Sequence, residues 1–184
     1  YQDVELHRDY DLSLPELCAD TAQLIQVFLN LMNNACESMT DFEQTLQQKA
    51  PTISSQLSSD IAQKYSDLNV NYKPKLHIQT RVVFQHTIGS LQHKQVLQIT
   101  LTDNGSGIDD ALIGQIFFPM VTNRAAGTGL GLSIVQDIMS RHHGMIDVSS
   151  KQAQGFSGSF KSHYQHNQTR FTLYLPFSQP SADR

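Results

Sequence analysis

An amphipathic helix expected over residues 20–39 (DTAQLIQVFLNLMNNACESM) is the feature that most constrains this chain. Asp20 is a good N-cap, and Gln23 three residues later can complete a capping box. At about 100° per residue, the apolar side chains fall on one side of the helix. They are Leu24, Val27, Phe28, Leu31, Ala35 and Met39. The pattern predicts a helix that buries this side in the core of a folded domain.

The opposite side of the same helix carries a polar stripe. Its members are Gln26, Asn30, Asn33, Asn34 and Glu37. Asn30 and Asn34 stand four positions apart, so their amides lie side by side. Amide oxygens can hold a hard cation, and amide NH₂ groups can bind phosphate, which suits a magnesium ion shared with a phosphorylated substrate. A solvated helix face is the alternative.

Composition excludes several other classes of protein. The chain has 184 residues, of which 39% are hydrophobic and 16% charged, as expected for one folded domain. No apolar run approaches the roughly 20 residues of a membrane-spanning helix. The net charge of -4 argues against broad nucleic-acid binding. Cys18 and Cys36 have no metal-ligand spacing, so we expect a reduced, cytoplasmic setting.

The remaining periodicity predicts a sheet. Strands are expected at about 76–86, 95–102, 145–150 and 169–175, after a short edge strand within 3–14. Short helices are expected at about 109–117 and 130–142, the second ending at Gly144. The predicted fold class is α+β, a two-layer α/β sandwich whose mostly antiparallel sheet is covered on one face by helices. Residues 40–75 are polar, and we interpret them as an insertion outside the core that could contain one or two weak helices.

The segment DNGSGI, residues 103–108, follows an expected strand. Gly105 and Gly107 allow tight turns and a close approach of the backbone to a ligand. Asp103 could accept a hydrogen bond from an exocyclic amine such as that of adenine. A common Asp-Asn-Gly hairpin turn is the alternative.

A second glycine-rich segment, GTGLGL at residues 127–132, directly precedes an expected helix. Gly127, Gly129 and Gly131 free backbone N–H groups beside a helix dipole, an arrangement that favours an anion. A flexible linker is the alternative. We interpret residues 109–129 as a lid with an apolar hinge. Arg124 in this lid could reach a phosphate or remain a solvated surface residue.

These elements, in this order, resemble the ATP-binding catalytic domain of sensor histidine kinases, whose Bergerat or GHKL fold is shared with the Hsp90, gyrase and MutL ATPases. LNLMNNACESM is similar to the N box, DNGSGI to the first glycine box, FFPM to the F box and GTGLGL to the second glycine box. RDYDLSLPEL, FFPMVTNRAAGTGLGLSI and FTLYLP are closer still to nitrogen-regulation kinases of the NtrB type.

The resemblance implies a role for each matching residue. Asn34 would be the Mg²⁺ ligand, and Asn30 would hold phosphate or the waters of the metal. Asp103 would bind the adenine amine, Ile108 and Leu132 would line the base pocket, and Thr172 would join through a water. Arg124 and Thr128 would contact the γ-phosphate of ATP. The other expected nucleotide contacts are Gly105, Gly107, Gly127, Gly129, Leu130 and Gly131.

Two positions depart from the relatives. Gln26 stands where the ATPases of this fold carry a glutamate that activates water, and an amide cannot act as a general base. This difference fits a kinase, whose attacking group is a histidine nitrogen. Glu37 stands where many sensor kinases carry a basic residue. One phosphate contact of the family is therefore missing, and Arg124 and the metal would have to bind the phosphates instead.

The expected partners follow from the same resemblance. They are ATP or ADP, a histidine-bearing dimerisation domain of the same protein, an NtrC-like response regulator and a PII-type regulator. None of the eight histidines has the sequence context of a phosphoacceptor, so residues 1–184 are expected to form the catalytic domain alone, as a monomer. A non-catalytic nucleotide-binding module and an ATP hydrolase of the same fold remain alternatives.

Overall fold

The computed structural model describes residues 4–54, 72–122, 127–151 and 167–177. The strands are β1 (Glu5–Asp9), β2 (Lys75–Ile88), β3 (Leu91–Asp103), β4 (Met145–Lys151) and β5 (Gln168–Pro176). The helices are α1 (Thr21–Ser54), α3 (Asp110–Ile113) and α4 (Gly131–Arg141). Within the described residues, no helix is long and apolar enough to cross a membrane.

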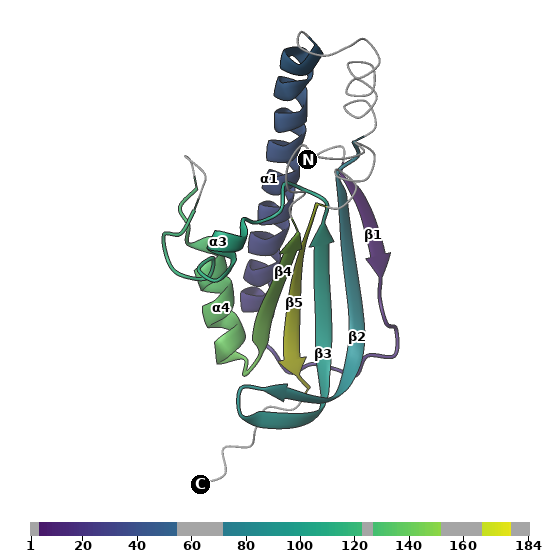
Figure 1. Cartoon of the computed structure of the whole chain (residues 1–184). Coiled ribbons are helices and arrows are strands. Elements are labelled where there is room, and N and C mark those ends of the chain that lie inside the picture. Colours follow the sequence, from purple (N-terminus) through teal and green to yellow (C-terminus); the bar gives the residue numbers. More distant parts are fainter. Residues whose placement is uncertain (1–3, 55–71, 123–126, 152–166, 178–184) are drawn as a thin grey trace.

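The strands form one sheet in the order β1-β2-β3-β5-β4, and the helices lie on one side of it (Figure 1). This arrangement confirms the predicted two-layer α+β sandwich. The sheet is mixed, however, because β1 pairs with β2 in parallel while the other neighbouring strands are antiparallel. The expected strands are all present. β1 lies within residues 3–14, and the other four strands each extend one or more residues beyond their predicted bounds.

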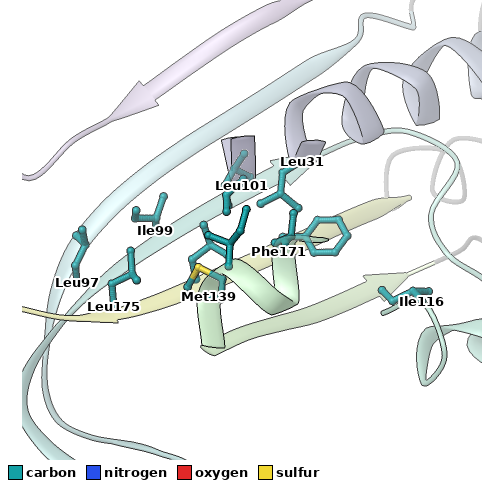
Figure 2. Close-up of a cluster of buried hydrophobic side chains, with 12 residues drawn as sticks. Leu31, Leu97, Ile99, Leu101, Ile116, Met139, Phe171 and Leu175 are labelled. Atoms are coloured by element: carbon teal, nitrogen blue, oxygen red, sulfur yellow. The ribbon is translucent and has the colours of Figure 1, made fainter. Parts of the chain in front are cut away.

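The core lies between the sheet and the two longer helices (Figure 2). Helix α1 contributes Val27 and Leu31 from its predicted apolar side, and α4 contributes Val135, Ile138 and Met139. The sheet contributes alternate residues of its two central strands. These are Leu97, Ile99 and Leu101 of β3, and Phe171, Leu173 and Leu175 of β5. The period of two along the strands and of 3.6 along the helices therefore brings one face of each element into contact.

Helix α1 is longer than predicted and corrects the interpretation of residues 40–75. It continues without a break to Ser54, so the first part of that segment belongs to the principal helix. Phe42 is buried and packs edge-to-face on Tyr72, with ring centroids 5.0 Å apart. The helix extends past the end of the sheet (Figure 1). Most side chains of residues 41–48 are exposed, and the sequence loses its apolar period there. Residues 55–71 lie outside the described residues.

The start of α1 is joined to the end of α4. Asp20 Oδ1 accepts hydrogen bonds from the N–H groups of Ala22 and Gln23 at 2.9 and 3.1 Å, which confirms the predicted N-cap. The Asp20 N–H donates to His142 Nε2 at 3.0 Å, and His142 Nδ1 lies 2.9 Å from the Ile138 carbonyl oxygen. The two contacts together require a neutral imidazole that donates through Nδ1.

The end of α4 also differs from the prediction that Gly144 provides its C-cap. His142 is the C-cap, and His143 adopts the left-handed conformation with φ 54°. Gly144 is needed for a different reason, since a Cβ atom there would lie 2.5 Å from the Tyr174 carbonyl oxygen. The glycine lets the chain pass closely over β5 as it enters β4.

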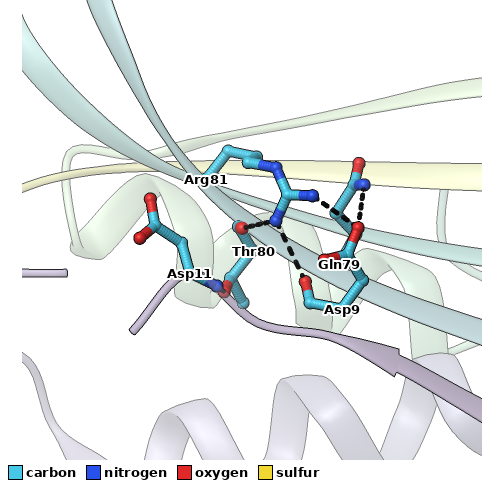
Figure 3. Close-up of polar contacts among 5 residues, drawn as sticks. All are labelled: Asp9, Asp11, Gln79, Thr80 and Arg81. Atoms are coloured by element: carbon cyan, nitrogen blue, oxygen red, sulfur yellow. Dashed lines mark hydrogen bonds and ion pairs between the residues drawn. The ribbon is translucent and has the colours of Figure 1, made fainter. Parts of the chain in front are cut away.

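Polar contacts hold the parallel edge strand β1 against β2 (Figure 3). Asp9 accepts hydrogen bonds from Arg81 and, at 2.7 Å, from Gln79 Nε2. These donors, Gln79 first and then Arg81, lower the pKa of the Asp9 carboxyl. Beyond the strand, the Asp11 N–H donates to Thr80 Oγ1 at 3.0 Å. Side chains thus continue the attachment where the backbone ladder of β1 ends.

Candidate nucleotide-binding site

A cavity of about 430 Å³ opens between α1, the loop after β3 and the start of α4. Its volume falls within the range of small-molecule sites. Most of the residues predicted from the sequence to contact a nucleotide line this cavity: Asn30, Asn34, Asp103, Gly107, Ile108, Gly127, Thr128, Gly129, Gly131 and Leu132. The polar stripe of α1 is therefore a wall of a cavity, and Asn33 and Glu37 of that stripe also border it.

Asn30 links α1 to the first residue of α4. Its Nδ2 donates to the Gly131 carbonyl oxygen at 3.2 Å, and its Oδ1 accepts from Gln26 Nε2 at 3.1 Å. Gln26, the residue that departs from the ATPase pattern, therefore orients the Asn30 amide. The two bonds fix the orientation of the amide, with its oxygen toward Gln26 and its nitrogen toward Gly131.

The loop after β3 begins with a tight Asp turn. Asp103 is buried, and its Oδ1 accepts a hydrogen bond from the Gly105 N–H at 2.9 Å. A Cβ atom on Gly105 would lie 2.3 Å from Ser38 Oγ and 2.7 Å from the Ser38 carbonyl carbon. Gly105 does not line the cavity, and its role in the structure is to let this loop lie directly on α1. Gly107 lines the cavity and has φ 76°, a conformation that favours glycine.

Hydroxyl groups fix the same loop from both sides, and sequence reasoning did not find them. On the α1 side, the Ser106 N–H donates to Ser38 Oγ at 3.1 Å. On the sheet side, the Ile108 N–H donates to Ser150 Oγ at 2.8 Å, and that hydroxyl lies 3.2 Å from Thr169 Oγ1. No local sequence signal marks Ser150, which comes from β4.

The expectation for Thr172 is wrong, and Thr169 stands in the cavity instead. Thr169 and Phe171 line the cavity from β5. Thr172 has the opposite parity along the strand, so its side chain is on the sheet face away from the helices. The strand itself was predicted correctly. Successive side chains of a strand point to opposite faces of the sheet, so residues 169 and 171 face the cavity and residue 172 faces away from it.

A backbone hydrogen bond joins two residues of the segment 109–129, predicted from the sequence to be a lid. The Met120 N–H donates to the Gly129 carbonyl oxygen at 2.9 Å. Gly129 has φ 64°, and a Cβ atom there would lie 2.6 Å from the Met120 carbonyl carbon. Phe117 packs against the main core. The predicted helix 109–117 is only the four-residue α3, capped by Asp109. Arg124 lies outside the described residues.

Helix α4 presents an uncapped N-terminus beside the cavity. Its N-cap is Leu130, which makes no side-chain capping bond and does not itself line the cavity. In contrast, Asp20 caps α1 and Asp109 caps α3. The N–H groups at the start of α4, together with the helix dipole, thus offer partial positive charge next to Gly131 and Leu132.

The charged lining of the cavity is acidic. Glu37, Asp41 and Asp103 border it, and none of its described lining residues is a lysine or arginine. The half-buried Tyr72 also senses the Asp103 charge: partial burial first, and then that charge, raise the pKa of the Tyr72 hydroxyl. Among the described residues, no cluster of three or more His, Cys, Asp or Glu side chains could hold a metal ion alone.

Comparison with known proteins identifies the class. Residues 19–179 match the family described as "Histidine kinase-, DNA gyrase B-, and HSP90-like ATPase". The chain belongs to this family. Solved structures agree on the fold, including a mycobacterial sensor histidine kinase MprB (TM-score 0.58, 17% identity, 95% of this chain and 84% of that one). The catalytic domain of histidine kinase ThkA gives a TM-score of 0.59 at 19% identity, over 96% of this chain and 82% of that one.

Relatives at higher identity carry the name NtrB. The chain is 34% identical over 94% of its length to the sensory histidine kinase/phosphatase NtrB of Vibrio alginolyticus, and 33% identical over the same share to that of Klebsiella oxytoca. A further relative with this name, from Rhizobium meliloti, is 27% identical over 96% of the chain. The chain spans 37% of the Vibrio and Klebsiella proteins and 36% of the Rhizobium protein.

Proposed function

We propose that this chain is the ATP-binding catalytic domain of an NtrB-like sensor histidine kinase. It holds ATP and presents the γ-phosphate to a histidine on a separate dimerisation domain, from which the phosphoryl group passes to a response regulator. One observation carries the proposal: the paired amides of Asn30 and Asn34, the buried Asp103 and the uncapped start of α4 border a single cavity. By the same relationship, the regulator is NtrC-like and a PII-type protein is a controller.

The two ends of the cavity suit the two ends of ATP. Asp103, with Ile108 and Leu132 beside it, forms an acidic and apolar end suited to the amine and rings of adenine. Thr169 takes the place first given to Thr172. The amides, Thr128 and the N–H groups of α4 form a neutral to positive end suited to phosphates. Arg124 remains the proposed charged contact to the γ-phosphate.

The donor set fits a magnesium ion that arrives with the nucleotide. Mg²⁺ commonly takes one or two protein oxygens and completes its shell with waters and substrate phosphates. Asn34 would supply the protein oxygen, while Asn30 is held by Gln26 and Gly131 and would contact phosphate or metal-bound water. When bound, the ion neutralises charge on the phosphates, which the acidic lining cannot do.

The position of Gln26 favours phosphotransfer over hydrolysis. A glutamine cannot remove a proton from water, and here its amide donates to Asn30. A histidine nitrogen needs no such base, so the chain can act mainly by positioning the nucleotide and neutralising charge. A non-catalytic nucleotide-binding module of the same fold is the second candidate. Glu37 favours it, because many sensor kinases carry a basic, positively charged residue at this position.

Two measurements test the proposal. Isothermal titration should detect binding of ATP or ADP that depends on magnesium, and a folded chain that gives no heat would contradict it. Phosphorylation of a supplied histidine-bearing helical domain should be abolished by Asn34→Asp and by Asp103→Asn. Nucleotide binding without phosphotransfer in the unaltered chain would favour the non-catalytic module.

Matched variants control for charge and folding. Gln44→Glu adds the same charge as Asn34→Asp at an exposed position of α1, and Asp147→Asn repeats the Asp103 change at an exposed position of β4. Both controls should keep nucleotide binding. Circular dichroism should show that all four variants are folded. Full activity in both Asn34→Asp and Asp103→Asn would refute the assigned roles.

A further inference from the structure

A second hollow lies at the other face of the sheet, near the end of β3. Its volume is about 450 Å³, and its lining includes His7, Lys75, His77, Thr102, Lys151 and Gln168. No described helix covers this face of the sheet (Figure 1). The nucleotide-binding role proposed above uses none of these six residues.

Strand register brings these side chains together. His7 of β1 pairs with His77 of β2, and their rings lie edge-to-face with centroids 6.5 Å apart. His77 pairs in turn with Thr102 of β3, which pairs with Arg170 of β5. Arg170 Nε donates to Thr102 Oγ1 at 3.4 Å, which places both side chains on the same face.

The adjacent row supplies two lysines. Lys75 precedes His77 by two residues on β2, and Gln168 precedes Arg170 by two residues on β5, so both share that face. Lys151 of β4 pairs with Gln168. All five strands of the sheet therefore contribute lysine, histidine, hydroxyl or amide side chains to one hollow.

Lys75, Lys151 and Arg170 bring three positive charges in and beside this hollow, against the two carboxylates of Glu5 and Asp103. Lys151 makes no ion pair within the described parts of the chain. Lys75 Nζ lies 3.3 Å from Glu5 Oε2, while Glu5 Oε1 lies 2.7 Å from His7 Nε2. Asp103 borders the hollow, but its carboxylate accepts the hydrogen bond from Gly105 in the loop against α1. This local balance is opposite to the net charge of -4 of the chain.

We propose that this hollow binds a small anion that carries two or more linked phosphate groups. Lys75 and Lys151 stand on strands separated by two others, a backbone span of about 14 Å at the usual strand spacing. A chain of phosphates bridges more of this span than a single phosphate does. The hydroxyl and amide side chains between the lysines supply donors for the remaining oxygens. The concave shape favours such a ligand over the flat face of a protein.

Inorganic pyrophosphate without magnesium is the probe, titrated into the ¹⁵N-labelled chain. Backbone amide signals of His77, Thr102 and Gln168 should shift, and those of Gly129–Leu132 should report any binding in the nucleotide cavity separately. The double variant Lys75→Gln/Lys151→Gln should bind pyrophosphate about tenfold or more weakly, because each lysine supplies a charge-assisted contact. Its affinity for ADP with magnesium should be unchanged.

For two further variants, the proposal predicts the direction in which the pyrophosphate affinity changes. Glu5→Gln frees Lys75 from its carboxylate partner and should tighten pyrophosphate binding. Lys94→Gln, which removes an exposed charge elsewhere on β3, should leave it unaltered. Equal affinity in the unaltered chain and the double variant would overturn the proposal. Shifts confined to Gly129–Leu132, or an equal loss in Lys94→Gln, would also overturn it. None of these outcomes depends on phosphotransfer.

Discussion

The N–H of Met120 donates to the carbonyl oxygen of Gly129 across 2.9 Å, and this bond closes the base of the lid segment. Both residues have positive φ, 66° for Met120 and 64° for Gly129. Met120 and Gly129, on either side of residues 121–128, are thus held together beside the cavity. Gly129 meets two demands at once, an unusual backbone conformation and close contact with Met120.

We expect Gly129→Ala to weaken nucleotide binding. The new Cβ would lie 2.6 Å from the Met120 carbonyl carbon. Left-handed φ costs a non-glycine residue about 1–2 kcal/mol, so the base of the lid has to shift. Calorimetric titration with ADP and magnesium should show an affinity lower by roughly tenfold, if the displaced lid base loses a charge-assisted contact to phosphate.

Gly114→Ala is the matched control for this change. Gly114 has φ -72°, and a Cβ atom there meets nothing within 4 Å. Alanine at such a site leaves stability unchanged or raises it by about 0.4–1 kcal/mol. Equal nucleotide affinities for the two variants would show that the contact between Gly129 and Met120 has no part in binding.

Gly105→Ala should destabilise the fold by about 1–3 kcal/mol, the usual cost of overpacking a tight contact. A Cβ atom would lie 2.7 Å from the Ser38 carbonyl carbon and 2.8 Å from the Met39 nitrogen, which belong to the backbone of α1. Urea unfolding should report the loss. Adding Ser38→Gly removes the hydroxyl but not the backbone contact, so the double variant should recover little; full recovery would assign the clash to the hydroxyl.

The N-cap of α1 should make stability depend on pH. Hydrogen bonds to the backbone N–H of Gln23, and then to Ala22 and the Gln23 side chain, lower the pKa of Asp20 below its ordinary value. A lowered folded-state pKa means that the carboxylate stabilises the fold above the unfolded-state pKa. This contribution is lost as pH falls through the folded-state pKa.

The comparison that isolates this effect is Asp20→Asn, because asparagine also caps helices but does not titrate. The stability advantage of the unaltered chain over the variant should shrink as pH falls from about 5 to about 3. Glu5, Asp9 and Asp11 also have lowered pKa values, and they cancel because both proteins carry them. A difference that stays constant over this range would contradict the prediction.

Leu173→Ala should be among the more damaging core substitutions. Leu173 of β5 is fully buried between α1, α4 and the neighbouring strands. Removing such a side chain costs about 2–5 kcal/mol, depending on how far the cavity collapses. Leu12, which is 96% exposed, provides the control. Leu12→Ala should change the free energy of unfolding by less than about 0.5 kcal/mol.

Local patterns were enough to predict most of the elements. The apolar side of residues 20–39 predicted the buried face of α1, because apolar residues on one face of a helix recur about every 3.6 residues in the sequence. The same reasoning missed the continuation to Ser54, because a helix that leaves the sheet no longer needs an apolar side. The same reasoning also missed the parallel pairing of β1 with β2. The direction of pairing depends on the neighbouring strand, and a five-residue segment contains no sequence pattern that predicts it.

By itself, the sequence determined that Asn30, Asn34 and Asp103 are candidates for one chemistry, because glycine spacing and side-chain type are local properties. Only the tertiary structure decided that Thr169 rather than Thr172 borders the cavity, since strand parity is set by register with distant partners. The same holds for the contact of Ser150 with the loop after β3 and for the placement of Lys75 and Lys151 on one face of the sheet. Contacts between residues far apart in the chain exist only once the sheet has assembled, and the sequence has no local periodicity that encodes them.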